Sequence, residues 1–386
     1  MSNISFEFAT TKRIVCKVNA ISAITTYCAD LAISRPLIVT DHGIRTAGLL
    51  DKLLDAFARS TDVDVGIFDG VEADPTDTQV QQALDVARSH QCDGVVGFGG
   101  GSSMDCAKLV AALCNSTQAL PDIYGIGNIH HSRLPLILIP TTAGTGSEVT
   151  PISIVTTGAN TKSGVVSPVL LPDIAILDAE LCIGLPPHVS AATGIDAMVH
   201  AIEAYTSKIK KNIYSDTLAK RALQLLSQNI EAACFEGTNL KARENMLLGA
   251  CMAGQAFANA PVGGVHALAY PLGGRFHIPH GLSNALVLPH VMRFNLSHAS
   301  QAYSELASCV SFSNSEDKND AALKFIQYFE SLMSKLNLPN TLCDVGVTKS
   351  ALNMLATDAM LQTRLLVNNP KPMTKNDALA IYQAAF

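Results

Sequence analysis

Two short segments in the second half of the chain carry histidines and an aspartate at spacings that suit a metal site. Asp196 and His200 are four residues apart, a spacing that places both side chains on one face of a helix. His266, His277 and His280 lie within fifteen residues of apolar, glycine-rich sequence. Two of these imidazoles with Asp196 and His200 would give three nitrogens and one oxygen, a set that suits Fe(II) or Zn(II) rather than Mg or Ca. We therefore expect a catalytic metal site with a position left open for a substrate oxygen.

A glycine-rich turn in the first half, GFGGGSS over residues 97–103, offers a phosphate site. Glycines allow the backbone to approach a diphosphate closely, and the first amides of a following helix point at the anion. Ser102 and Ser103 add hydroxyl donors. The spacing does not complete G-x-G-x-x-G and the P-loop lysine is absent, so a simple tight turn is the alternative.

A second loop, PTTAGTGSEVT over residues 140–150, is dense in hydroxyl groups and small residues. Two such loops at strand ends match the place where open α/β sheets bind ligands. Asp41, at the tip of an earlier strand, would accept hydrogen bonds from a ribose diol and repel a 2′-phosphate, which favours NAD over NADP. The alternative for Asp41 is a helix N-cap.

The elements that position these residues alternate in the first half between short β-rich runs and helical stretches. Strands are expected in PLIVTD, VDVGIFDG, CDGVVGFGGGS and LPLILIPTT, and helices at about 47–58, 77–89 and 103–114. Such alternation predicts a parallel sheet with helices on both faces. From about residue 190 the chain is helical, including 196–205, 215–234 and 243–258. We predict an α/β dinucleotide-binding domain over 1–187 and an all-α metal-binding domain over 188–386, divided near the adjacent prolines of GLPPH.

Composition narrows the class of protein. The 386 residues are 48% hydrophobic and 16% charged, with a formal net charge of -6. This permits a large core and gives no general attraction to nucleic acid or an anionic membrane. The ten cysteines form no CxxC pair, and the sequence shows neither a signal peptide nor a membrane span. We expect a cytoplasmic protein with reduced cysteines.

The motifs GFGGGSSMDCAK, PTTAGTGSEVT, GIDAMVHAIEAY and HALAYPLGGRFHIPHG together resemble the iron-dependent (group III) alcohol dehydrogenases, which have a dehydroquinate-synthase-like fold. The resemblance runs over nearly the whole chain and implies NAD and Fe(II), with Zn(II) as the other metal, and a homodimer. The metal ligands that it implies are Asp196, His200, His266 and His280. The cofactor contacts that it implies are Asp41, Gly99, Gly100, Gly101, Ser102, Asp105, Thr141, Thr142, Thr145, Ser147 and Lys162.

The chain departs from the family where many members carry a histidine four residues after the third metal ligand. Tyr270 stands there, and a neutral phenol with an ordinary pKa of about 10 is a poor proton acceptor near pH 7. His277 is the nearest substitute in sequence, and a structural role is the alternative for it. We expect the metal to activate an alcohol oxygen while hydride passes to the nicotinamide, in a cleft between the domains.

Other functions remain open at this stage. A hydroxy-acid dehydrogenase or a transhydrogenase of the same family is the main alternative, since Arg275 could pair with a carboxylate. A lyase resembling dehydroquinate synthase would need more lysines and arginines near the ligands than Arg275, Lys210 and Lys211. A non-catalytic metal or nucleotide sensor lacks support from any DNA-reading motif. We expect a small alcohol or aldehyde as the substrate.

Overall fold

The computed structural model describes residues 5–158, 161–310 and 317–386. These form two compact units, Ala9–Ile183 and Gly184–Phe386, and residues 5–8 belong to the second. The first unit thus ends four residues before the expected boundary after residue 187. Residues 1–4 of the expected first domain lie outside the described residues.

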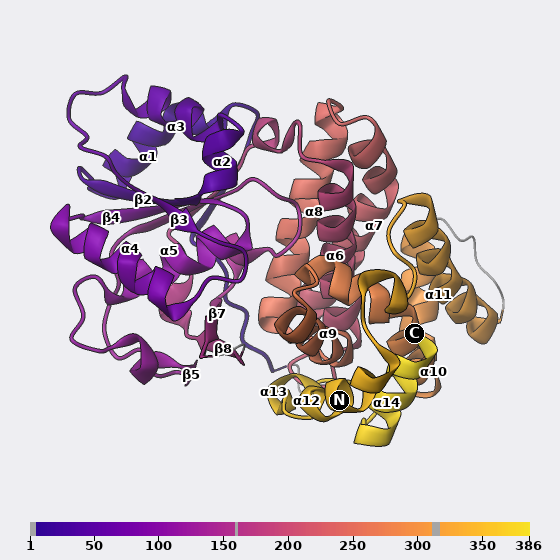
Figure 1. Cartoon of the computed structure of the whole chain (residues 1–386). Coiled ribbons are helices and arrows are strands. Elements are labelled where there is room, and N and C mark those ends of the chain that lie inside the picture. The colour runs from indigo at the N-terminus through magenta and orange to yellow at the C-terminus, as the bar shows by residue number, and fades with distance from the viewer. Residues whose placement is uncertain (1–4, 159–160, 311–316) are drawn as a thin grey trace. The chain divides into compact units, whose positions relative to one another are not determined.

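The first unit is built on a six-stranded parallel sheet in the order β1-β9-β6-β4-β2-β3. Figure 1 labels three of these strands, β2, β3 and β4. Its strands are β1 Arg13–Cys16, β2 Pro36–Asp41, β3 Gly66–Val71, β4 Gly94–Gly99, β6 Leu136–Pro140 and β9 Ile174–Leu177. The helices are α1 Ile24–Asp30, α2 His42–Thr46, α3 Leu49–Phe57, α4 Asp77–Ser89 and α5 Gly101–Leu113. A second sheet, β5-β8-β7, joins β5 Gly125–Ile126, β7 Ile152–Thr157 and β8 Thr161–Val166, with β7 and β8 antiparallel.

Alternation along the main strands fills two hydrophobic cores, one on each face of the sheet. Leu37 and Leu136 pack into one core with residues of α4 and α5. Ile38 and Ile137 pack into the other with residues of α1 and α3. Because both faces are buried, these strands are apolar throughout, as is usual in parallel sheets. The expected parallel sheet with helices on both faces is confirmed.

The second unit is helical. Its helices are α6 Pro187–Thr206, α7 Ile213–Phe235, α8 Leu240–Asn259, α9 Gly264–Phe276, α10 His280–Ala307, α11 Lys318–Lys335, α12 Leu352–Ala359, α13 Thr363–Leu366 and α14 Lys375–Ala384. Every residue of α6 from Gly194 to Tyr205 is buried, because α7, α8 and α10 all pack against it. α6 is therefore the central helix of this unit, and the polar side chains that it carries in this stretch lie in the interior. Within the described parts of the chain, no helix has the length and apolar character needed to cross a bilayer.

Candidate metal centre

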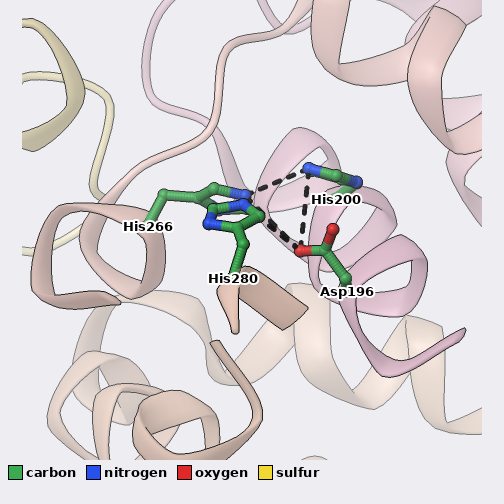
Figure 2. Close-up of side chains that lie close together, drawn as sticks. All are labelled: Asp196, His200, His266 and His280. Atoms are coloured by element: carbon green, nitrogen blue, oxygen red, sulfur yellow. Dashed lines mark hydrogen bonds and ion pairs between the residues drawn. The ribbon is translucent and has the colours of Figure 1, made fainter. Parts of the chain in front are cut away.

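Three helices of the second unit bring together the four side chains proposed as metal ligands. Asp196 and His200 project from the middle of α6, His266 lies in the first turn of α9, and His280 is the first residue of α10. Each offers one ligand atom, and these atoms all lie within 4.8 Å of one another. Figure 2 shows the four side chains converging from α6 and from the starts of the two later helices.

The spacing of the four ligand atoms fits one metal ion. Asp196 Oδ1 lies 4.0 Å from His200 Nε2, 3.9 Å from His266 Nε2 and 3.6 Å from His280 Nε2. The Nε2 atoms of His266 and His200 are 3.0 Å apart. Ligands at about 2.1 Å from a tetrahedral ion lie about 3.4 Å from one another. Small side-chain adjustments would therefore complete the shell, and the donor set is the N3O set expected for Fe(II) or Zn(II).

The group is buried but reachable from one side. The side chains of Asp196, His200 and His266 are at most 5% exposed, whereas that of His280 is 36% exposed. Burial acts to raise the pKa of Asp196, but the positive charge of the three imidazoles when they are protonated, His200 foremost, and the hydrogen bond from Asn284 outweigh it and lower that pKa below its ordinary value. Asp196 is therefore an ionised acceptor, which a cation requires.

Glycines allow the helices to approach closely enough for the ligands to meet. A Cβ on Gly281 would lie 2.3 Å from the carbonyl oxygen of Ala192 on α6. The first turn of α10 therefore touches the α6 backbone directly beside Asp196, and this contact carries His280 to the site. At the start of α9, a Cβ on Gly264 would lie 2.7 Å from Asn369 Oδ1.

Two polar residues contact the ligands and were not anticipated from the sequence. Glu203 Oε2 lies 2.6 Å from His266 Nδ1. Asn284 Nδ2 donates to Asp196 Oδ1 at 2.6 Å and lies 3.2 Å from His280 Nε2. Glu203 follows His200 by three positions and Asn284 follows His280 by four, spacings that place each pair on one helix face. These spacings were the feature of the sequence from which Glu203 and Asn284 could have been predicted.

The two residues considered for proton transfer are placed differently. The ring of Tyr270 has its centroid 5.9 Å from that of His280 and 6.5 Å from that of His266. His277 is exposed, at the left-handed C-cap of α9 (φ 55°). Among the described residues it makes no hydrogen bond or ring contact with the four ligands. The structure therefore brings Tyr270, and not His277, to the ligand group.

The residues proposed for the cofactor gather in the α/β unit at the ends of three neighbouring parallel strands. Asp41 ends β2, Gly99 ends β4, and the hydroxyl-rich loop follows β6. β2 and β4 flank the point where the strand order reverses, the usual ligand site of an open α/β sheet. Asp41 Oδ1 caps α2 by accepting from the Ile44 amide at 3.0 Å, and Oδ2 accepts from Ser103 Oγ at 2.9 Å. The N-cap alternative is thus realised, beside the glycine turn.

The turn itself is tightly constrained and lacks a side-chain cap. Gly99 has a φ of 148°, and a Cβ on Gly101 would lie 2.7 Å from Thr145 Cγ2. The Thr141 amide donates to the Gly99 carbonyl at 3.0 Å, and Thr142 is the nearest neighbour of Gly100. No side chain of the described residues caps the start of α5, and its first turn holds no acid. Its first amides are therefore oriented to receive an anion.

Two further cofactor candidates, Asp105 and Ser147, contact the buried side chain of Lys108. Asp105 accepts from Ser147 Oγ at 2.5 Å and from the Ile154 amide at 2.8 Å, and lies 3.6 Å from Lys108 Nζ. Burial lowers the pKa of Lys108 to about 8, against the opposing charges of Asp105 and Glu148. Asp105 and Ser147 thus hold the hydroxyl-rich loop against α5. Lys108 follows Asp105 by three positions, a spacing from which their contact on one helix face could have been predicted.

Asp74 connects the last two cofactor candidates, Lys162 and Ser102. Lys162 on β8 forms an ion pair with Asp74 Oδ1 at 2.5 Å. The Asp74 amide donates to Ser102 Oγ at 3.2 Å. This chain of contacts links β8 to the first turn of α5, so all the cofactor candidates belong to one region of the α/β unit.

Comparison with known proteins places the chain in a family. The model of iron-containing alcohol dehydrogenases matches residues 11–179, and the model of the C-terminal part of that family matches residues 190–386. The chain is 40% identical over 354 residues to Long-chain-alcohol dehydrogenase 1 of Geobacillus thermodenitrificans, covering 91% of this chain and 89% of that protein.

Solved structures agree with this match. A crystal structure of 1,3-propanediol oxidoreductase has a TM-score of 0.95 and 37% identity, covering 99% of this chain and 100% of that one. Sulfoacetaldehyde reductase from Bifidobacterium kashiwanohense, in complex with NAD+, has a TM-score of 0.88 and 29% identity, covering 99% of each chain. This chain belongs to the iron-containing alcohol dehydrogenase family, oxidoreductases that act on alcohols and aldehydes.

Proposed function

We propose that the chain is an NAD-dependent, metal-dependent alcohol dehydrogenase that transfers a hydride between NAD and a small alcohol or aldehyde. The observation that carries the proposal is the convergence of Asp196, His200, His266 and His280, with exposure confined to His280. A divalent ion held there, Fe(II) by preference or Zn(II), would act as a Lewis acid on the substrate oxygen. The family resemblance further favours a cytoplasmic homodimer.

The protein residues supply position and a dry environment. Phe257 stacks on His200 with the ring centroids 4.3 Å apart, and Tyr270 lies against His280. Phe257 is buried and covers the His200 side of the ligand group, where the exclusion of water strengthens electrostatic interactions. We propose His277 as the proton acceptor, with Tyr270 remaining neutral; because His277 is exposed and does not contact the ligands, the proton would reach it through solvent.

In the α/β unit, we propose that the α5 amides and the glycine turn hold the diphosphate of NAD. Asp41 would accept the adenosine ribose hydroxyls and disfavour the extra phosphate of NADP. A related sulfoacetaldehyde reductase has been solved with NAD+ bound, which supports the choice of cofactor. Thr142 and Thr145 offer hydroxyl groups beside the same turn.

The hydroxy-acid alternative depends on Arg275 as a partner for a carboxylate. Arg275 Nε donates to Asp358 Oδ2 at 2.9 Å, so its charge is already paired on the protein. An uncharged alcohol or an aldehyde is therefore the substrate class that we propose.

The test is a scan of primary alcohols, diols and 2-hydroxy acids with NAD, using protein reconstituted anaerobically with Fe(II) or Zn(II). We expect alcohol-dependent NADH formation that disappears when the metal is removed and returns when it is restored. Preference for 2-hydroxy acids would favour the alternative substrate class. Equal activity of the metal-free protein would contradict the metal role.

A further inference from the structure

Glu203 is a buried carboxylate beside the proposed ligands, and no role was predicted for it from the sequence. It lies on the same face of α6 as Asp196 and His200, seven and three residues after them. Its side chain is 7% exposed. A buried carboxylate is costly unless its oxygens are hydrogen-bonded and its charge is compensated, so its partners identify its role.

Both oxygens of Glu203 face donors from the start of α9. Oε1 accepts from the backbone amide of Val265 at 2.7 Å, and Oε2 lies 2.6 Å from His266 Nδ1. A backbone amide can only donate. The Nδ1 atom must also donate if His266 Nε2 is to offer its lone pair to a metal, because a neutral imidazole carries one proton. The two oxygens of a carboxylate accept without donating, so Glu203 suits both positions.

We propose that Glu203 is the positioning residue that holds His266 as the Nδ1-protonated tautomer, with its Nε2 lone pair directed at the metal. The inference rests on the proposed metal role of His266. Carboxylates that accept the second ring N–H of a metal-bound histidine fix the orientation of the ring and raise its basicity. Glu203 acts through His266 and is not itself a ligand.

The local charge balance supports this assignment. Asp196 and Glu203 together contribute two negative charges, and in the described part of the chain no lysine or arginine pairs with either carboxylate. Three neutral imidazoles add no charge. A divalent cation would therefore bring the buried group to a formal net charge of zero, as a low-dielectric interior favours.

A purely structural role for Glu203 makes a different prediction. The start of α9 has glycine at its N-cap, and acceptors from elsewhere take its first amides: Asn369 Oδ1 accepts from Gly264 and Glu203 Oε1 accepts from Val265. If Glu203 served only as such a cap, its loss would destabilise the metal-free protein and leave the ligand chemistry of His266 unchanged.

The experiment is Glu203→Gln, which keeps the shape but leaves one acceptor for two donors. If the amide oxygen stays with Val265, the NH2 group faces His266 Nδ1 and favours the Nε2-protonated tautomer, whose Nε2 has no lone pair to offer the metal. We expect Zn(II) to bind about 10- to 100-fold more weakly in a competitive titration of the metal-free protein. We also expect a changed Co(II) absorption spectrum and a changed 15N shift pattern of the His266 ring.

Three controls separate the possible outcomes. Glu231→Gln makes the same change at an exposed site of the same unit (50% exposed) and should bind Zn(II) like wild type. Asn369→Ala removes the other α9 cap and should lower thermal stability without changing the Co(II) spectrum. His266→Ala, which removes the ligand itself, should bind most weakly.

Each outcome bears on one claim. If wild type fails to bind Zn(II) or Co(II), the proposed metal function is wrong. If wild type binds and Glu203→Gln binds equally with the same Co(II) spectrum, the positioning role is overturned while the metal function stands. Equal loss of affinity in Asn369→Ala would assign the effect to the helix start and also overturn the proposal.

Discussion

Replacing Lys108 with methionine tests whether a buried cation holds the proposed cofactor loop. The lysine side chain is 0% exposed. Its Nζ donates to Ser147 Oγ at 2.7 Å, Thr150 Oγ1 at 3.1 Å and the Ile152 carbonyl at 2.7 Å, and lies 3.6 Å from Asp105 Oδ1. Lys108→Met keeps most of the apolar stem but leaves the Asp105 carboxylate buried without its cation.

The size of the effect follows from this geometry. Removing one partner of a buried ion pair costs about 3–5 kcal/mol. The unit Ala9–Ile183 has roughly 175 residues, and unfolding entropy is about 2.1 cal/mol/K per residue. The melting temperature of this unit should therefore fall by about 8–14 °C. NAD should also bind more weakly, because Ser147 and its loop lose the Lys108 contacts and keep only those of Asp105 to α5.

Calorimetry measures the melting temperature and a binding titration measures the NAD affinity. Lys12→Met is the matched control, since Lys12 is 79% exposed in its pair with Asp173 and exposed pairs contribute at most about 1 kcal/mol. If Lys108→Met melts no lower than Lys12→Met, the buried pair does not stabilise the unit. A lowered melting temperature with unchanged NAD affinity would refute the link to the cofactor loop.

Three further predictions concern separate parts of the chain. Asp41→Asn keeps a cap for α2 but removes the charge, so the preference for NAD over NADP in kcat/KM should fall by about tenfold; a wild-type preference for NADP would refute the role of Asp41. His277→Ala should slow alcohol oxidation by about 10²–10⁴-fold near neutral pH, less at high pH, with metal content intact and Tyr270→Phe nearly silent; the reverse order of effects would make the nearer Tyr270 the functional group. Burial acts to raise the pKa of Asp173, but hydrogen bonds led by those of Arg133 outweigh it and lower that pKa. Asp173→Asn should thus cost about 3–5 kcal/mol in urea unfolding at pH 7, a cost that fades as pH falls below about 4; an equal cost at pH 3 would contradict the ionised pair.

The elements with strong local patterns were predicted closely from the sequence. The strand expected at 36–41 and the helix expected at 77–89 are β2 Pro36–Asp41 and α4 Asp77–Ser89. β1 and β9 were not predicted, because each has four residues and depends on partners far along the chain. The β7–β8 hairpin was also missed, since its hydroxyl-rich strands are only partly buried and lack the continuous apolar run of a central strand.

In the proposed site too, features with a local sequence pattern were predicted and contacts between distant segments were not. Spacing within a segment indicated Asp196 with His200, and the density of histidines indicated the second half of the site. The spacing from His200 places Glu203 on the ligand face of its helix, but its partner His266 is 63 residues away, a separation that local periodicity does not encode. Asp105 stays a prediction as a cofactor contact; its contacts with Ser147 and the Ile154 amide depend on residues distant in the sequence and were not predicted.

The central claim is that Asp196, His200, His266 and His280 hold one catalytic metal ion. The most direct test is the metal content per chain, measured by elemental analysis after anaerobic reconstitution with Fe(II) or Zn(II) and removal of free ion. We predict one ion per chain for wild type and for His298→Ala, which removes an exposed histidine of α10. His266→Ala and His280→Ala should remain folded by circular dichroism and hold almost none. Full metal content in either ligand variant would contradict the assignment.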